Sequence, residues 1–211
     1  MISFLHTSPV HIATFDALMD ELAPGMVRQH RVEEGWLVEA QSGMTTGLSD
    51  TIVKAMRELA APGVGVCTCS TIGAIAESAT RHDAPVIRID RALMEAALAH
   101  GSRPLVAMCL YSTRAPTLNL LTGVARKMGL NIIPQVVMCD GAWTHFQSGD
   151  ANAYAHSIAD TIKTEMSCPD SIVLAQGSMA VAEPLLADTG VPVLSSPRLG
   201  VIRALELLNR P

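Results

Sequence analysis

The segment most informative about the fold spans residues 64–77 and reads VGVCTCSTIGAIAE. Its first part, Val64–Cys69, is short, apolar and rich in β-branched residues, which indicates a buried strand. The residues after it change to helical spacing, and we expect a helix from about Thr71 to Arg81. A buried strand followed at once by a helix is typical of α/β proteins with parallel sheets.

The same alternation extends in both directions along the chain. Further apolar runs predict strands at residues 2–5, 26–32, 85–89, 105–110, 132–138, 171–176 and 191–194. Segments with helical spacing lie between them, at about 15–22, 49–61, 91–100, 116–128, 150–166 and 179–187, and a last helix begins at Ser196-Pro197. Pro184 falls inside one expected helix, where it removes an internal hydrogen bond. The pattern predicts an α/β fold.

Several short motifs occur twice, at an offset of about half the chain. VCTCSTIGAIAE at 66–77 is similar to VLAQGSMAVAE at 173–183, LHTS at 5–8 to LYST at 110–113, and APVI at 84–87 to VPVL at 191–194. We therefore expect two similar doubly wound parallel-sheet units with a cleft between them. The first unit is predicted at 1–101 and the second at 102–196, with the last helix, 197–211, packing back on the first.

Composition excludes several classes of protein. Hydrophobic residues make up 49% of the 211 residues and charged residues 17%, which is unlike a disordered chain. The net charge of −5 and the lack of a basic patch argue against nucleic-acid binding. The apolar runs are too short to span a membrane, and the N-terminus does not resemble a signal peptide. Five cysteines, an odd number, favour reduced thiols in a cytoplasmic protein.

In parallel sheets, ligands bind beyond the carboxyl ends of the strands. The residues predicted there include one thiol, one imidazole, one guanidinium and many small hydroxyls, which together suit a small carboxylate: His6, Thr7, Ser8, Cys69, Ser70, Thr71, Thr113, Arg114, Thr117, Gln176, Gly177 and Ser178. The same loops lack the glycine-rich motifs that hold phosphates.

Cys69 is the strongest catalytic candidate, because a thiol at a helix N-terminus is favoured as a thiolate. Its alternative role is that of an apolar core residue. Cys67 and Cys69 lack a second pair of ligands at zinc spacing, so we expect no metal site. His6 could face Cys69 from a neighbouring strand and assist proton transfer, or it could be a hydrogen-bonded turn residue. Arg114 could clamp a carboxylate, or it could be a solvated residue at a helix start.

These motifs resemble the aspartate/glutamate/hydantoin racemase superfamily. VCTCST resembles its Cys-Asn-Thr-like motif, and STRAPT resembles its Gly-Thr-Arg-x-Thr loop with one residue more. His6 falls where the family often has an acid, and Gln176, in SIVLAQGSMA, falls at the position of the family's second cysteine. The resemblance implies two similar α/β units, a cofactor-free cleft and a homodimer.

The resemblance implies a cofactor-independent isomerase or racemase that acts on a small carboxylic acid through Cys69, with His6 assisting. Gln176 cannot exchange a proton as a thiol does, so two-thiol racemisation conflicts with the sequence. Two alternatives therefore stay open: a decarboxylase or other lyase of the same superfamily, and a carboxylate-binding protein without turnover.

Overall fold

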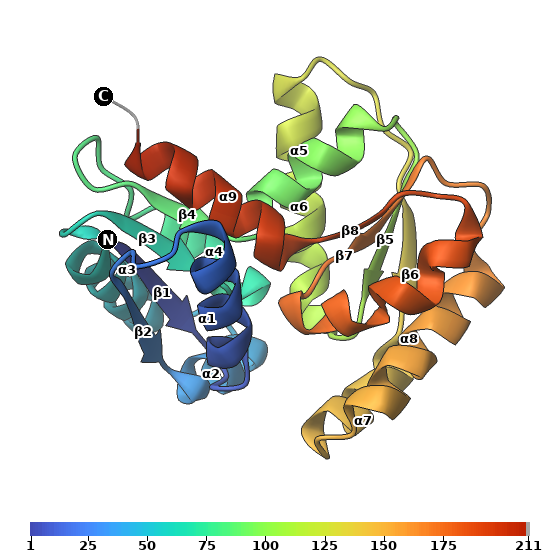
Figure 1. The fold of residues 1–211 in the computed structure, drawn as a ribbon, viewed down its shortest axis with the longest axis horizontal. Coiled ribbons are helices and arrows are strands. Elements are labelled where there is room, and N and C mark those ends of the chain that lie inside the picture. The colour runs from blue at the N-terminus through green and yellow to red at the C-terminus, as the bar shows by residue number, and fades with distance from the viewer. Residues whose placement is uncertain (210–211) are drawn as a thin grey trace. The chain divides into compact units, whose positions relative to one another are not determined.

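The computed structural model describes residues 1–209 and contains two compact units (Figure 1). Unit 1 comprises residues 1–90 together with those from 197 onward, and unit 2 comprises residues 91–196. Each unit has one four-stranded parallel sheet with flanking helices. The prediction of an α/β fold with two similar parallel-sheet units is confirmed.

Unit 1 has the strand order β2-β1-β3-β4. Its elements are β1 (Ile2–His6), α1 (His11–Leu22), β2 (Arg28–Val32), α2 (Glu34–Ser42), α3 (Thr46–Ala60), β3 (Val64–Cys67), α4 (Ser70–Glu77), β4 (Val86–Arg88) and α9 (Ser196–Leu208). Each strand except β2 is buried along its whole length, which accounts for the apolar runs in the sequence.

Unit 2 repeats this order as β6-β5-β7-β8. Its elements are α5 (Arg91–Ala99), β5 (Pro104–Met108), α6 (Tyr111–Lys127), β6 (Gln135–Met138), η1 (Asp140–Ala142), α7 (Trp143–Gln147), α8 (Ala151–Glu165), β7 (Ser171–Leu174), η2 (Gly177–Thr189) and β8 (Val193–Ser195). Asp150 caps α8 by accepting a hydrogen bond from the Ala153 N–H.

The strand registers match the two units residue by residue. Leu5 lies opposite Cys67 in unit 1, and Ala107 lies opposite Leu174 in unit 2. One residue further along β1 and β5, His6 therefore corresponds to Met108. Two residues beyond the ends of β3 and β7, Cys69 corresponds to Gln176.

Unit 1 buries apolar side chains on both faces of its sheet. Leu5 and Cys67 pack with α3 and α4 on one face. Phe4 packs on the other face with Phe15 of α1 and with Val201 and Ala204 of α9. Neighbouring residues of a strand point to opposite faces, so His6 shares the face of Phe4 and not that of Cys67.

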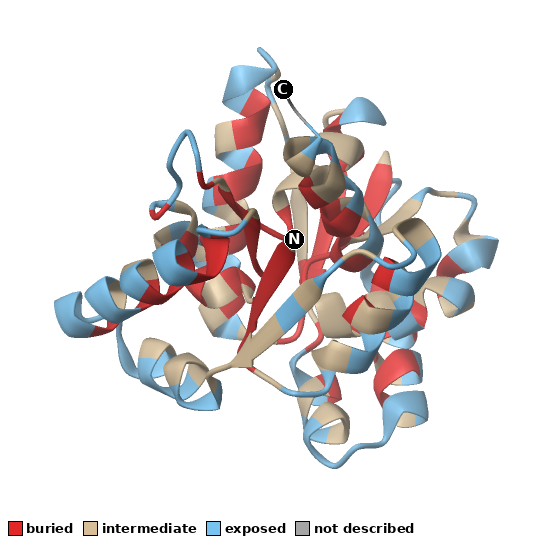
Figure 2. Ribbon diagram, turned by 60° about the vertical axis from the view of Figure 1, so that its left-hand side comes forward, coloured by how far each residue is buried: buried red, intermediate tan, exposed pale blue. Residues whose placement is uncertain are grey.

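Unit 2 packs one face of its sheet against α7, α8 and η2. Tyr154 of α8 is its largest fully buried side chain. Helix α5 contacts β7 and β8 of this unit, and the Ser171 hydroxyl donates to the Ala97 carbonyl of α5. The outer faces of the helices carry most of the exposed residues (Figure 2).

Several details differ from the sequence-based expectation. The boundary lies between Asp90 and Arg91 and not after Gly101, because α5 packs in unit 2. The segment 177–189 forms 3-10 helix rather than α-helix, consistent with Pro184 lacking a backbone donor. Helix α6 already begins at Tyr111, with Pro116 inside it. The last helix ends at Leu208, and the expected positions 210–211 lie outside the described residues.

Candidate functional site

Cys69 is the N-cap residue of α4, directly after the loop that follows β3. Its side chain is half-buried and packs against the α3–α4 face of the sheet. It makes no capping hydrogen bond to the described residues, so its sulfur is not tied to the helix end. Ser70 and Thr71 form the first turn of α4 beside it. A helix N-terminus favours negative charge, which suits a reacting sulfur or a bound anion.

Cys67 has a structural role. It is fully buried, and its thiol donates to the Cys69 carbonyl oxygen across 3.6 Å. Burial raises the pKa of Cys67 far above that of a free thiol, and the neighbouring Cys69 thiol acts in the same direction. Cys67 therefore stays protonated and supports the loop that carries Cys69.

His6 is fully buried at the end of β1, with both ring nitrogens occupied. Nδ1 lies 2.9 Å from the Thr68 hydroxyl, and Nε2 lies 2.9 Å from Nδ1 of His30. Burial lowers the pKa of His6 to about 3, and positive charge on His30 and on His11 contributes in the same direction. His6 is therefore neutral at physiological pH.

Within the described residues, the structure does not bring His6 to Cys69. His6 packs on the α1 face of the sheet against Phe15, with the rings tilted, whereas Cys69 packs on the α3–α4 face. No contact among the described residues supports the expected arrangement, with the two side chains facing each other, and it stays a prediction. His6 contacts the loop of Cys69 through Thr68, the residue before it.

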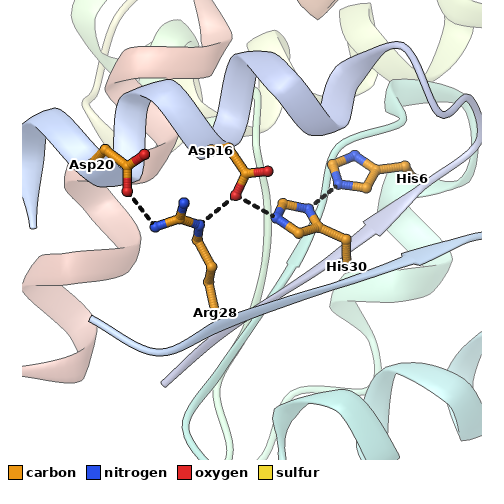
Figure 3. A network of polar contacts seen from close by, with 5 residues as sticks. All are labelled: His6, Asp16, Asp20, Arg28 and His30. Atoms are coloured by element: carbon orange, nitrogen blue, oxygen red, sulfur yellow. Dashed lines mark hydrogen bonds and ion pairs between the residues drawn. The ribbon is translucent and has the colours of Figure 1, made fainter. Parts of the chain in front are cut away.

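The contacts of His6 continue outward into a charged network (Figure 3). His30 Nε2 lies 3.4 Å from Asp16 Oδ1 of α1. Asp16 also pairs with Arg28, which bonds Asp20 at 2.7 Å. The Arg28 guanidinium holds the pKa of the Asp16 carboxyl below its ordinary value. Asp16 is therefore a carboxylate at physiological pH.

The loop after β1 places small polar residues near the same end of the sheet. Thr7 is buried and Ser8 is half-buried, and both lie between β1 and α1. Their position follows the prediction that polar residues gather beyond the strand ends.

In unit 2, Gln176 is the N-cap residue of η2 and is buried. Its backbone angles, φ −114° and ψ 138°, are close to the −100° and 117° of Cys69. Its side-chain Oε1 accepts a hydrogen bond of 2.6 Å from the Cys109 N–H at the end of β5. The amide thus fastens the loop of η2 to the neighbouring strand.

A hydroxyl and thiol chain lies beside Gln176. Tyr154 OH is 3.5 Å from Cys109 Sγ and 2.9 Å from Ser178 Oγ. Burial raises the pKa of Cys109 to about 11, and burial also raises the pKa of Cys139 and of Tyr154. These groups stay protonated near neutral pH and form part of the core of unit 2.

The expected arginine motif lies in the first turns of α6. Arg114 is exposed, so its guanidinium is available to an anion. Thr113 and Thr117 are buried, and the Thr117 hydroxyl has no hydrogen-bond partner among the described residues. Gly177 and Ser178 open η2 and are half-buried.

Sequence reasoning missed Thr68, His30, Asp16 and Tyr154. The available signal for His30 was its position in a predicted strand, but its contact with His6 depends on the register between β1 and β2. No group of three or more His, Cys, Asp or Glu residues within 1–209 could hold a metal ion. Over the same range, no helix has the length and apolar character needed to cross a membrane.

Comparison with protein-family models and with curated protein sequences finds no match. Solved structures do match along almost the whole chain. An aspartate racemase from Picrophilus torridus is 14% identical, with a TM-score of 0.69 over 98% of this chain and 93% of its own. A glutamate racemase from Bacillus anthracis is 15% identical, with a TM-score of 0.75 over 99% of this chain and 81% of its own.

A glycine-to-cysteine mutant of arylmalonate decarboxylase, in a sulfate-associated form, is 15% identical. Its TM-score is 0.65 over 98% of this chain and 92% of its own. At such low identity these likenesses establish a shared fold. The chain has the fold found in aspartate and glutamate racemases and in arylmalonate decarboxylase, as the sequence resemblance predicted.

Proposed function

We propose that this chain is a cofactor-independent enzyme that acts on a small carboxylic acid through Cys69. The observation that carries the proposal is the half-buried Cys69 thiol, which is free of capping bonds to the described residues at the N-terminus of α4. The racemases and the decarboxylase that share the fold support this class of chemistry.

In the proposed isomerase reaction, the Cys69 thiolate removes the proton from the carbon next to the carboxylate. The C–H electron pair moves into an enolate-like intermediate, and an S–H bond forms. Return of a proton to the opposite face of the same carbon inverts that carbon, and loss of the S–H proton regenerates the thiolate. Thr7, Ser8, Ser70 and Thr71 are proposed to hold the anion in unit 1. The residues proposed for unit 2 are Thr113, Arg114, Thr117, Gln176, Gly177 and Ser178.

The second candidate is a decarboxylase, and Gln176 favours it. Gln176 stands where unit 1 has Cys69, and its amide cannot accept and return a proton. A substituted malonate would lose CO2, and the electrons of the broken C–C bond would form the enolate. Cys69 would then protonate the carbon, and water would restore the thiol. This reaction needs one thiol, whereas two-base racemisation needs two.

Proton exchange in D2O distinguishes these candidates. The protein is incubated with amino acids, hydantoins, substituted malonates and unsaturated diacids, and each is followed by proton NMR. Deuterium at the α-carbon with inversion supports an isomerase, and CO2 release with one deuterium gained supports a decarboxylase. Exchange without inversion indicates a one-sided site. Absence of any reaction favours a carboxylate-binding protein instead.

Two cysteine variants provide the control. We expect Cys69→Ala to lose at least about a hundredfold in rate, the scale typical for loss of a positioned acid–base group. Cys168→Ala removes an exposed thiol in unit 2 and should retain the wild-type rate. Turnover that survives in Cys69→Ala would refute the assignment of the thiol. The expected carboxylate ligand, homodimer and cytoplasmic location stay predictions.

A further inference from the structure

The contacts from Asp16 through His30 to His6 (Figure 3) continue to Thr68 and so connect α1, β2 and β1 with the loop that carries Cys69. The two rings are stacked, with centroids 5.2 Å apart and planes 14° from parallel. His30 also stacks on Phe4 at 5.2 Å. Both imidazoles are thereby held in fixed orientations, so their hydrogen-bond directions can be assigned.

Thr68 determines the tautomer of His6. The Thr68 hydroxyl donates to the Leu5 carbonyl across 3.1 Å, and a hydroxyl has only one proton to donate. It therefore accepts from His6, so Nδ1 of His6 carries a proton. The buried ring is neutral, and its Nε2 is then an acceptor. The partner of that acceptor, Nδ1 of His30, must be a donor.

Asp16 then determines the charge of His30. The second nitrogen of His30, Nε2, lies 3.4 Å from a carboxylate oxygen of Asp16, within ion-pair distance, and has no hydrogen-bond partner among the described residues. A proton on Nε2 places a positive ring beside this carboxylate, which Coulomb attraction favours over a neutral ring, so we assign Nε2 a proton. His30 with protons on both nitrogens is an imidazolium, and Asp16 is its counter-ion.

We infer that Asp16, His30 and His6 form a chain of polar contacts with one fixed arrangement of protons, called the relay below. This relay positions the Thr68–Cys69 loop. In this relay Asp16 is a carboxylate, His30 an imidazolium and His6 a neutral donor to Thr68. His6 and His30 are thus positioning residues and do not exchange protons with substrate. The role of Cys69 in this inference rests on the proposed function, whereas the proton arrangement does not.

The surrounding charges fit this arrangement. Arg28, on the same strand as His30, pairs with Asp16 and keeps it ionised. His11 of α1 lies with its ring centroid 6.2 Å from that of His6, and burial lowers the pKa of His11. The lowered pKa favours the neutral form of His11 and so limits the positive charge beside His6.

Nitrogen-15 NMR of the histidine rings of wild-type protein at pH 7 tests the proton arrangement directly. We expect both nitrogens of His30 to be protonated, and His6 to show a protonated Nδ1 and a bare Nε2. His30→Phe, which keeps the ring stacked on Phe4, and His6→Asn identify the signals. A neutral His30, or a His6 protonated at Nε2, would overturn the inference whether or not the protein has turnover.

Alkylation of Cys69 tests the positioning role. In a Cys168→Ala background, iodoacetamide labelling is followed by peptide mass spectrometry. We expect Thr68→Val and His30→Phe to raise the alkylation rate of Cys69 about tenfold. Each variant removes one hydrogen bond of the relay, and the loop that carries the half-buried Cys69 then moves more freely. Thr68→Ser keeps the hydroxyl and should stay within about twofold of the parent. If Thr68→Val and His30→Phe both leave the alkylation rate of Cys69 unchanged, the relay does not support this loop.

Discussion

Units 1 and 2 share one sheet order and one backbone path but hold their equivalent loops in different ways. In unit 2 the loop is held by its own N-cap residue, because the Gln176 side chain accepts a hydrogen bond from the Cys109 N–H. In unit 1 the equivalent residue is Cys69, and the loop is fastened through its neighbour Thr68 to His6. The position of the fastening residue decides whether the N-cap side chain is free.

The strand residues near these loops also differ between the two units. The registers that match His6 with Met108 also match His30 of β2 with Val136 of β6. The polar relay of unit 1 is therefore replaced by apolar side chains in unit 2. On the edge strands, Arg88 of β4 corresponds to Ser195 of β8. Unit 1 thus has a buried charged residue on this edge strand where unit 2 has a serine.

Among the changes that test the difference between the units, Asp90→Asn is expected to lower stability the most. Arg88 and Asp90 form two hydrogen bonds of 2.7 Å, and both side chains are buried. Removal of the carboxylate leaves a buried guanidinium unpaired, which costs about 3–5 kcal/mol. We expect the free energy of unfolding of unit 1 to fall by this amount in urea.

The two tryptophans allow each unit to be followed separately. Trp36 lies in unit 1 and Trp143 in unit 2, so Trp143→Phe leaves a reporter for unit 1 alone. Ser195→Ala, at the position equivalent to Arg88, should change stability by less than about 0.5 kcal/mol. A loss below about 1 kcal/mol for Asp90→Asn would show that the ion pair does not support unit 1.

The next effect is a pH dependence confined to unit 1. The pKa of His6 is about 3 in the folded chain and 6.5 in its ordinary range. Between these values the unfolded chain binds a proton that the folded chain does not. Stability therefore falls as the pH decreases through this window, by at most about 1.4 kcal/mol per pH unit for this group. Above pH 7 the effect is absent.

His6→Asn removes this titration and keeps a donor near Thr68. Urea unfolding between pH 4 and pH 7 should then show a smaller slope for unit 1. Unit 2 has Met108 at the equivalent position and serves as the internal reference. A slope that is the same in wild type and variant would mean that His6 is already protonated in the folded chain.

Much of the fold could be predicted, because apolar runs and helical spacing are local properties of the sequence. The strand-to-helix change placed Cys69 at a strand end and at the N-terminus of the following helix, and it placed Gln176 at a strand end. The unit to which α5 belongs could not be predicted, since an apolar helix face suits either sheet. Segment 177–189 was expected as an α-helix in spite of Pro184, and the structure has 3-10 geometry there.

The site was predicted in its position but not in its contacts. Strand alternation places His6 with Phe4 and Cys67 with Leu5, on opposite faces, and this signal argued against a His6–Cys69 pair. The partners of His6 come from β2 and from the loop after β3, which are distant in sequence. Their contacts depend on register, which no single segment encodes.

The smallest expected effect is the difference in the cost to the free energy of unfolding between substitutions of the two N-cap residues, Gln176 and Cys69. Gln176→Leu leaves the Cys109 N–H buried without its acceptor, which costs about 1–3 kcal/mol. Cys69→Ala removes a half-buried sulfur without a capping bond, so we expect a cost below about 1 kcal/mol. Urea unfolding with the reporter of each unit measures both. If Cys69→Ala proves the costlier change, the thiol is a core residue, and the difference between the units lies in packing rather than in chemistry.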